Sequence, residues 1–272
     1  MNLENYFISL FNNKYIGDDA AIVDGMIYSQ DAFFENVHFK KEWMNYEQIA
    51  KKAMLVNISD AIAMNAKPLY ALLSVAMPKE MRRESMQSLA RGFNSVAKCY
   101  NLQIIGGDTI SNTKLDISIT IISKSKKPLH RKGVKNGYLF AYTGTLSQSA
   151  KELKKLLNLG KIHAKSKFVN IELRADFITN TRRFLGTGMD VSDGLFSDLE
   201  KMILINRIGF SFLKSIGKDI GCSGEEYEML VSFDPRYKKA VLRRAKQSRT
   251  PLTIFGVATR NRYTNRCKAH HF

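Results

Sequence analysis

Six aspartates stand in short segments where their carboxylates could bind a cation. Carboxylate oxygens are hard ligands, which suit Mg²⁺ better than zinc or iron. In enzymes, Mg²⁺ held in this way commonly bridges the phosphates of a substrate. The sequence therefore predicts a magnesium-dependent enzyme that uses ATP, with metal ligands drawn from Asp18, Asp31, Asp60, Asp108, Asp190 and Asp193.

The first two of these aspartates are brought together by a β-hairpin predicted over residues 20–30. An Asp-Gly dipeptide between two apolar segments is a strong signal for a two-residue turn. If this dipeptide makes the turn, Asp18 faces Asp31 across the two strands. Opposed like charges destabilise a strand pair unless a cation lies between them. The alternative is a frayed strand end at which the two side chains diverge into solvent.

A helix predicted over residues 45–64 carries the third aspartate on an apolar face. At helical spacing, Asp60 shares a stripe with Ile49, Ala53, Val56 and Met64. A carboxylate in such a place needs a partner, a metal ion or a shifted pKa. The alternative is an aspartate that pairs with a nearby lysine or caps a neighbouring loop.

The segment Gly106-Gly107-Asp108-Thr109 ends a predicted strand. Glycines let backbone N–H groups approach a ligand closely, and an aspartate beside them is well placed to hold a metal ion. The same residues also occur in ordinary turns, which is the alternative.

The last two aspartates lie in residues 188–194, GMDVSDG, directly before a predicted helix. The N-terminus of a helix favours phosphate, and Asp190 and Asp193 are spaced so that both could face one site. The alternative is that Ser192 or Asp193 only caps the helix.

Alternating strands and helices must position these aspartates. Helices are expected at 80–98, 147–158, 168–184, 195–206 and 236–247. Strands are expected at 69–77, 137–144, 209–213 and 253–259, with a further strand pair at 102–107 and 115–123. This mixture predicts an α/β (α+β) protein. A basic turn before residue 137 suggests two domains, 1–136 and 137–272.

Composition sets outer limits on function. The 272 residues carry a net charge of +17, which could mean nucleic-acid binding. The basic residues form no long run, however, so an anionic small substrate is the preferred explanation. No apolar run is long enough to span a bilayer, and no secretion signal is recognised, so we expect no membrane contact and a cytoplasmic location. The three cysteines are far apart, which argues against a disulfide framework or a zinc site.

Two common phosphate-binding patterns are absent. The sequence has no GxxxxGK[ST] segment and lacks the protein-kinase motif set. Instead, a series of segments resembles, in order, the thiamine-monophosphate kinase family of the aminoimidazole ribotide synthetase superfamily. These segments are IGDDAAIV, SQDAFFENVHF, NISDAIAMNAKP, IIGGDT, LHRKGVKNG, MDVSDGLFSDL and GEEYEML. A histidine seven positions after Asp31, followed by NISDAIAM, favours this family over its relatives.

The resemblance implies direct transfer of the γ-phosphoryl group of ATP to thiamine monophosphate, which gives ADP and thiamine diphosphate. Such transfer depends on positioning and charge neutralisation by several Mg²⁺ ions, without a catalytic nucleophile of the protein. It also implies a two-domain fold whose N-terminal ATP- and magnesium-binding halves pack their sheets into a barrel across a homodimer, with nucleic acid playing no part.

The resemblance also assigns roles to residues. It adds Ser29 and Gln30 to the six aspartates as magnesium ligands. Nucleotide contacts fall on Gly107, Asp108, Arg131 and Ser192, and contacts to the thiamine substrate fall on His38 and Glu225.

The sequence departs from the family pattern in three places. Gln30 stands where a threonine or serine is usual, and Arg266 stands where an aromatic residue packs on the thiamine, which leaves Tyr263 and Phe272 as candidates to substitute. A proline-containing basic motif is missing from residues 150–185.

Three alternatives to a thiamine-monophosphate kinase stay open from the sequence. They are another ATP-using enzyme of the superfamily, a family member that binds ATP without transfer, and a non-catalytic basic nucleic-acid-binding protein.

Overall fold

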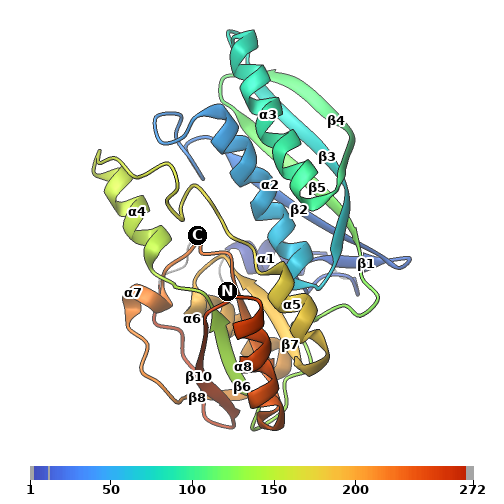
Figure 1. The fold of residues 1–272 in the computed structure, drawn as a ribbon, viewed down its shortest axis with the longest axis vertical. Helices are drawn as coiled ribbons and strands as arrows, with labels where there is room; N and C mark the ends of the chain where they lie inside the picture. Colours follow the sequence, from blue (N-terminus) through green and yellow to red (C-terminus); the bar gives the residue numbers. More distant parts are fainter. Residues whose placement is uncertain (1–2, 12, 268–272) are drawn as a thin grey trace.

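The strands form two five-stranded sheets in the computed structural model, which describes residues 3–11 and 13–267 (Figure 1). The first sheet, in the order β1-β2-β5-β3-β4, contains β1 (Ala21–Val23), β2 (Met26–Phe34), β5 (Asp116–Lys124), β3 (Lys67–Pro78) and β4 (Gln103–Asn112). The second, in the order β7-β9-β6-β10-β8, contains β7 (Thr187–Val191), β9 (Glu228–Phe233), β6 (Leu139–Thr143), β10 (Leu252–Thr259) and β8 (Gly209–Phe212).

The helices precede or connect these strands along the chain. They are α1 (Leu3–Ser9), α2 (Tyr46–Ala63), α3 (Arg83–Tyr100), α4 (Gln148–Leu157), α5 (Ala175–Thr181), α6 (Leu195–Asn206), α7 (Lys218–Gly221) and α8 (Lys238–Gln247), with 3-10 turns at Arg182–Phe184 and Pro235–Tyr237. No described helix is long and apolar enough to cross a membrane. Buried apolar residues from both halves of the chain form one continuous cluster, so the division near residue 136 stays a prediction.

The predicted hairpin is confirmed. Val23 pairs with Met26 across the two-residue turn, and the ladder continues to Ala21 opposite Tyr28. Beyond Ala21 the chain leaves the sheet, so the ladder ends two residues short of Asp19.

The predicted pairing of the strands near 102–107 and 115–123 is wrong. β3 lies between β4 and β5 and pairs in parallel with β4 and antiparallel with β5. The crossover through α3 allows a parallel pair, and it leaves β4 at the edge of the sheet.

Helix α2 is the central element of the molecule and begins with a capping box. The Asn45 side chain accepts a bond from the backbone N–H of Gln48, whose side chain reaches back to the Asn45 backbone. α2 packs against α3, against β2 and β5 of the first sheet, and against β7 of the second (Figure 1). It is therefore buried on more sides than a single apolar stripe predicts.

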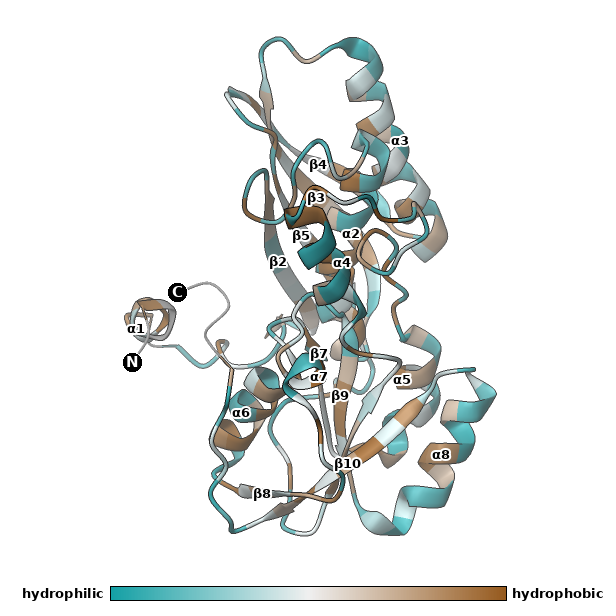
Figure 2. Cartoon of the chain, turned by 90° about the vertical axis from the view of Figure 1, so that its left-hand side faces the viewer, coloured by the Kyte–Doolittle hydropathy of each residue, from teal (hydrophilic) through white to brown (hydrophobic). Residues whose placement is uncertain are grey.

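Among the described residues, the helices that pack on the first sheet are α2 and α3, which lie on one face, and no described helix covers the opposite face. Apolar side chains on β2, β3 and β4 remain between 36% and 58% exposed there and along the edge strand: Tyr28, Phe34, Tyr70, Leu72, Ile105 and Ile110. Figure 2 shows α2 and α3 on the other side of these strands. An apolar sheet face of this kind calls for a covering partner.

The helix predicted over 168–184 is wrong in its first half, since α5 starts only at Ala175. Phe168, Val169 and Ile171 are all buried in the non-helical stretch before it. Arg174 then turns its guanidinium to Glu228, with two N–O distances of 2.8 Å. Core packing and this ion pair hold the segment in an irregular conformation.

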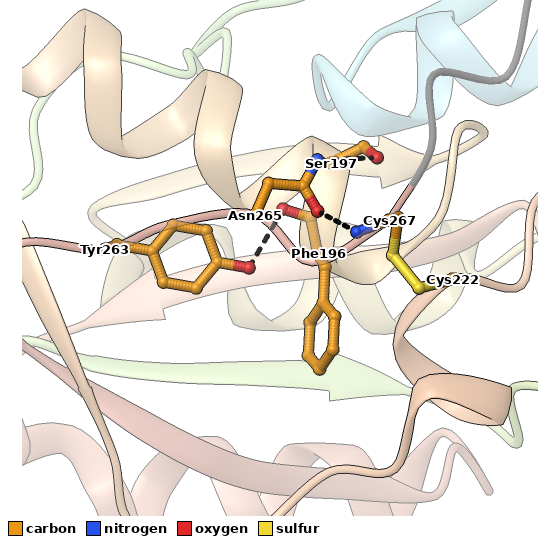
Figure 3. Close-up of a disulfide and its surroundings, with 6 residues drawn as sticks. All are labelled: Phe196, Ser197, Cys222, Tyr263, Asn265 and Cys267. Carbon is orange, nitrogen blue, oxygen red and sulfur yellow. Dashed lines mark hydrogen bonds between the residues drawn. A yellow bond between two sulfur atoms is a disulfide. The ribbon is translucent and has the colours of Figure 1, made fainter.

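A disulfide joins Cys222 to Cys267, contrary to the prediction made from cysteine spacing (Figure 3). The Cα atoms are 5.5 Å apart and the residues are separated by 45 positions. The prediction failed because the two cysteines belong to no short motif, and only the folded chain brings them together. Cys99 is free and exposed.

Cys267→Ser is expected to lower the thermal unfolding midpoint by several degrees in buffer that contains no thiol reductant. Opening a loop of this length gives the unfolded chain entropy equivalent to at most about 4 kcal/mol. Differential scanning calorimetry with and without a thiol reductant measures the effect, and Cys99→Ser is the matched control. Equal midpoints for Cys267→Ser and the unaltered chain would contradict a bond that stabilises the fold.

Candidate active site

Three aspartates from distant parts of the chain meet at one point. One carboxylate oxygen from each of Asp19, Asp60 and Asp190 lies within 4.8 Å of the other two. Asp19 precedes β1, Asp60 is in the last turn of α2, and Asp190 is in β7. They line a cavity of about 310 Å³ whose walls also include Asp31, Asp193 and Glu225. So many carboxylates in so small a space require protons or cations to offset their repulsion.

Burial and mutual repulsion raise the pKa of Asp31, Asp60 and Asp190. Burial, then the charges of Asp31 and Asp190, raises the pKa of Asp60 well above 3.8. Burial, then Asp19, raises the pKa of Asp31 to about 6. The pKa of Asp190 is raised well above its ordinary value, with burial again the largest cause.

The donor set fits a hard divalent cation. All three clustered groups offer oxygen atoms, and the Oδ2 atom of Asp19 is buried without a hydrogen-bond partner in the structure. A buried carboxylate oxygen of this kind is costly unless a ligand satisfies it. Mg²⁺, which prefers carboxylate and phosphate oxygens, suits these residues better than a softer metal.

Arg131 supplies the positive charge beside the cluster. Its Nε lies 3.0 Å from Oδ1 of Asp19, and its NH2 group contacts the same oxygen. Burial lowers the pKa of Arg131, but Asp19 raises it more, so the guanidinium stays charged. Arg131 also lines the cavity, where a guanidinium can bind phosphate oxygens.

Asp18 lies outside the cavity, and the expectation that it faces Asp31 across the hairpin is wrong. Its Oδ2 lies 2.7 Å from Nδ1 of His130, and its Oδ1 accepts a bond from the backbone N–H of Arg131. Because the chain turns away from the sheet before Ala21, it is Asp19 that enters the cluster. Asp18 instead holds the segment that carries Arg131.

Asp108 and Gly107 are also separate from the cluster within one chain. Both lie on β4, three strands away from β2, which corresponds to roughly 14 Å at the usual strand spacing. Asp108 is exposed, and its Oδ1 accepts a bond from the N–H of Thr109. Gly107 has a structural reason to be glycine, since its φ is 146° and a Cβ there would lie 1.7 Å from the carbonyl oxygen of Leu73.

Ser192 and Asp193 line the cavity just before α6. Neither is the N-cap of that helix, which is Gly194, so the capping alternative is wrong. Lys201 on the next turns of α6 donates to Asp193 at 2.5 Å and to Asp198 at 3.0 Å. This lysine therefore tethers Asp193 at the rim of the cavity.

Ser29 and Gln30, on β2, point to opposite faces of the sheet. The buried hydroxyl of Ser29 donates to the carbonyl of Asn57 on α2 at 3.3 Å. Gln30 borders the cavity, but its side-chain carbonyl accepts a bond from Thr120 on the neighbouring strand at 2.9 Å. The structure thus brings Ser29 to the α2 side and engages the side chain of Gln30 elsewhere.

His38 and Glu225, the predicted substrate contacts, both line the cavity. Nδ1 of His38 accepts a bond from the N–H of Phe34 at 3.0 Å. The carboxylate of Glu225 lies 2.7 Å from Nζ of Lys52, whose side chain is fully buried. The Lys52 ammonium also lies 3.5 Å from the centre of the Phe168 ring.

Sequence reasoning missed Lys52. It lies on α2 four and eight positions before Val56 and Asp60 and therefore on the same face. A lysine on an apolar stripe is as unusual as an aspartate there, and that signal could have identified it.

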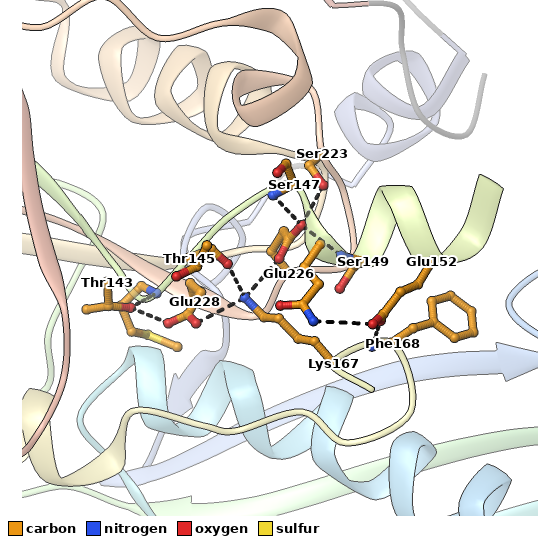
Figure 4. A network of polar contacts seen from close by, with 12 residues as sticks. Thr143, Thr145, Ser147, Ser149, Glu152, Lys167, Phe168, Ser223, Glu226 and Glu228 are labelled. Carbon is orange, nitrogen blue, oxygen red and sulfur yellow. Dashed lines mark hydrogen bonds and ion pairs between the residues drawn. The ribbon is translucent and has the colours of Figure 1, made fainter. Parts of the chain in front are cut away.

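A buried polar network holds the segment that presents Glu225 (Figure 4). Glu226 accepts bonds from the backbone of Ser147 and Ser149 and from the hydroxyl of Ser223. Glu228 is paired with Lys167 at 3.1 Å and with Arg174 at 2.8 Å. Burial raises the pKa of Glu228, but its bonds to Arg174 and the charge of Lys167 lower it overall. These hydrogen bonds and ion pairs thus fix the backbone that follows Glu225.

Comparison with known proteins identifies the family of the chain. A family model for the N-terminal domain of AIR synthase related proteins matches residues 17–124. The thiamine-monophosphate kinase of Bacillus subtilis is 31% identical over 219 residues, which cover 74% of this chain and 67% of that relative. This chain belongs to the thiamine-monophosphate kinase family. The thiamine-monophosphate kinase of Nitrosopumilus maritimus is 28% identical over 237 residues, 79% of this chain and 76% of that protein.

The fold matches solved structures of the thiamine-monophosphate kinase family over nearly the whole chain. A structure described as AaThiL complexed with AMPPCP and TMP superposes with a TM-score of 0.83 at 21% sequence identity. The match covers 96% of this chain and 90% of that one. At this identity the likeness establishes the mixed α/β fold, and residue roles rest on the geometry above.

The aromatic residue expected near the C-terminus to pack on the thiamine has no free equivalent among the described residues. The hydroxyl of Tyr263 donates to the carbonyl of Phe196 at 3.1 Å (Figure 3), and its ring packs edge-on against Phe210. Tyr263 and Arg266 line a separate cavity of about 370 Å³. Phe272 lies outside the described residues.

Lys52→Met is expected to raise the KM for the phosphoryl acceptor about tenfold, with a smaller change in kcat. The methionine fills similar space but leaves Glu225 without its ionic partner, and one hydrogen bond between charged groups is worth about 1.5–3 kcal/mol. Steady-state kinetics at varied acceptor concentration measure the effects on KM and kcat separately. Lys52→Arg keeps the charge and should recover part of the loss. An unchanged KM in Lys52→Met would rule out this positioning role.

Mg²⁺ binding is expected to release protons and to weaken as the pH falls from 7.5 to 5.5. The carboxyl groups with raised pKa, among them Asp31 at about 6, must be deprotonated to hold the ion. Isothermal titration calorimetry in buffers of different ionisation enthalpy measures both effects. A pH-independent affinity would contradict the assignment.

The stability of the metal-free protein should show the opposite trend with pH. A raised carboxyl pKa means that the folded chain keeps protons that the unfolded chain has lost. The metal-free protein should therefore lose stability as the pH rises from about 4 through 6, and added Mg²⁺ should restore it most at the higher pH.

Proposed function

We propose that this protein is a magnesium-dependent thiamine-monophosphate kinase. In the reaction, the bond between the γ-phosphorus of ATP and its bridging oxygen breaks, and a phosphate oxygen of thiamine monophosphate bonds to that phosphorus. The products are ADP and thiamine diphosphate. The observation that carries the proposal is the meeting of Asp19, Asp60 and Asp190 beside Arg131, in a member of this family.

The chain's own residues would bind and orient the two substrates. Asp31 and Asp193, together with the clustered aspartates and Ser29, would hold the metal ions. The ions, when bound, would offset the repulsion between the two anionic phosphate chains. Arg131 and Ser192 would bind the nucleotide phosphates, while His38 and Glu225 would contact the thiamine phosphate. Asp19 replaces Asp18 in this proposal, and Gln30 contributes at most through its backbone.

Gly107 and Asp108 would bind the nucleotide and metal ions in the site of a second copy of the chain, since they lie too far from the cluster of their own chain. The apolar face of the first sheet and the edge strand β4 are exposed, and a homodimer that pairs these surfaces into a barrel would bury them. In such a dimer, β4 of one subunit would approach the cluster of the other. Residues 1–136 would then form the dimerisation and ATP-binding domain and residues 137–272 a second α/β domain, in a cytoplasmic enzyme.

The decisive experiment measures ADP formation from ATP with and without Mg²⁺ and thiamine monophosphate. The proposal expects ADP only when all three are present, and thiamine diphosphate in equal amount. The substrates of aminoimidazole ribotide synthetase and selenophosphate synthetase serve as the comparison. Turnover with one of these and none with thiamine monophosphate would sink the proposal, and Mg-dependent ATP binding without any turnover would indicate a family member that only binds.

A further inference from the structure

A second large cavity lies at the C-terminal ends of α2 and α3. Its volume is about 940 Å³, and it shares no lining residue with the candidate active site. Its walls come from the turn after α2, from Tyr100, from residues 124–127 at the end of β5, and from α5 with the 3-10 turn after it. Pockets of this size hold nucleotide-sized molecules in other proteins.

The charged side chains that line this cavity are all basic. Six basic side chains line it and no acidic one does: Lys67, Lys124, Lys126, Lys127, Arg182 and Arg183. No ion pair found among the described residues involves any of the six. Like charges gathered on a concave surface repel one another and attract an anion.

Arg182 stabilises the wall of the cavity through hydrogen bonds to the backbone. Its guanidinium donates to the backbone carbonyls of Lys127 at 2.9 Å, Pro128 at 3.2 Å and Leu185 at 3.3 Å. It therefore joins the 3-10 turn to the segment after β5. Contact with an anion falls to the four lysines and to Arg183.

The lysine-bearing segment is fixed before any ligand arrives. The hydroxyl of Ser125 donates to the carbonyl of Asn65 at 2.7 Å, and the side-chain amide of Asn65 donates to the carbonyl of Lys127 at 3.0 Å. These bonds anchor residues 125–127 to the turn after α2. A fixed backbone lowers the entropy that ligand binding must overcome.

The floor of the cavity is apolar. Ile62, Ala66 and Pro68 are buried there, and Tyr100 is half-buried. An inorganic anion would leave this surface uncovered, whereas a flat organic group could pack on it. We propose that the cavity binds an organic polyphosphate, a flat heterocycle bearing two or three phosphate groups, without a metal ion.

A chelator separates this site from the candidate active site. Without divalent cations the carboxylates around Asp60 repel polyphosphates, so binding that persists in EDTA reports the basic cavity. Isothermal titration calorimetry with ADP in EDTA is the measurement, with inorganic pyrophosphate as the comparison for the apolar floor. ADP should bind more tightly than pyrophosphate, and its binding should weaken as salt is added.

The test variant combines Lys124→Gln, Lys126→Gln and Lys127→Gln. It should weaken ADP binding in EDTA at least tenfold, while the single Lys126→Gln change should weaken it less. The matched control removes the same charge from exposed positions of α4, through Lys151→Gln, Lys154→Gln and Lys155→Gln, and should change the affinity less than twofold. Circular dichroism confirms that the variants are folded.

Three results would overturn the proposal. The first is the absence of ADP binding to the unaltered chain in EDTA. The second is an equal loss in the test and control variants, which would reduce the effect to the overall charge of the protein. The third is binding of pyrophosphate as tight as that of ADP, which would remove the role of the apolar floor. None of these results depends on kinase activity.

Discussion

Asp60→Asn is expected to abolish magnesium-dependent turnover and to raise the melting temperature of the metal-free protein. The substitution removes one of three carboxylates whose oxygens lie within 4.8 Å. Loss of one group that stabilises charge in the transition state typically costs about 100- to 1000-fold in rate, and loss of a metal ligand should reach at least the upper value. The same change relieves repulsion in the cluster, where burial and neighbouring acids hold the pKa of Asp60 high.

The two halves of this prediction need separate measurements. Coupled assays of ADP formation over a range of Mg²⁺ concentrations give the turnover, and thermal unfolding in EDTA gives the stability. Asp176→Asn, on the exposed side of α5, is the matched control and should change neither. If Asp60→Asn retains near-normal turnover at low Mg²⁺, Asp60 is not a metal ligand. A lower melting temperature of Asp60→Asn in EDTA would contradict the predicted repulsion and show that groups within the chain already compensate the charge of Asp60.

Mixing two inactive variants, Asp60→Asn and Asp108→Asn, is expected to restore activity. Within one chain Asp108 lies on the edge strand β4, three strands from β2, too far to join the cluster. If the partner subunit supplies Asp108, a mixed dimer has one site that draws both intact residues from different subunits. Random exchange of subunits should then recover about one quarter of the full activity.

The exchange is started by mild denaturation of the mixture and refolding, with each variant treated alone as the control. Size-exclusion chromatography with light scattering establishes that dimers are present. No recovery in a mixture of confirmed dimers would place Asp108 and Asp60 in the same subunit's site or remove Asp108 from the chemistry. Full activity of Asp108→Asn alone would remove it as well.

Local signals predicted the elements that carry the site. The Asp-Gly turn fixed the register of β1 against β2, and the apolar spacing between residues 45 and 64 located α2 within one residue of each end. Both patterns depend on neighbours in the sequence, so no tertiary information was needed. Asp60 stood out for the same reason, as a charge on an apolar stripe.

Long-range choices were not available from the sequence. Asp18 and Asp19 are adjacent, and only the point at which the chain leaves the sheet decides which one enters the cluster. The parallel pairing of β3 with β4 depends on a crossover of the whole length of α3. Lys52 was passed over because a single lysine in a helix is usually exposed, and its partner Glu225 is 173 positions away.

The bond between Cys222 and Cys267 also makes the number of free thiols in the chain depend on whether the protein has been in oxidising or reducing conditions. Thiol alkylation before and after reduction, followed by mass spectrometry, would count the labelled cysteines in protein taken directly from its cells. One label before reduction and three after would indicate an oxidising history, since Cys99 alone is free when the bond is closed. Three labels from the outset would indicate a reducing one. The oxidation state of this pair can thus report the compartment in which the protein resides.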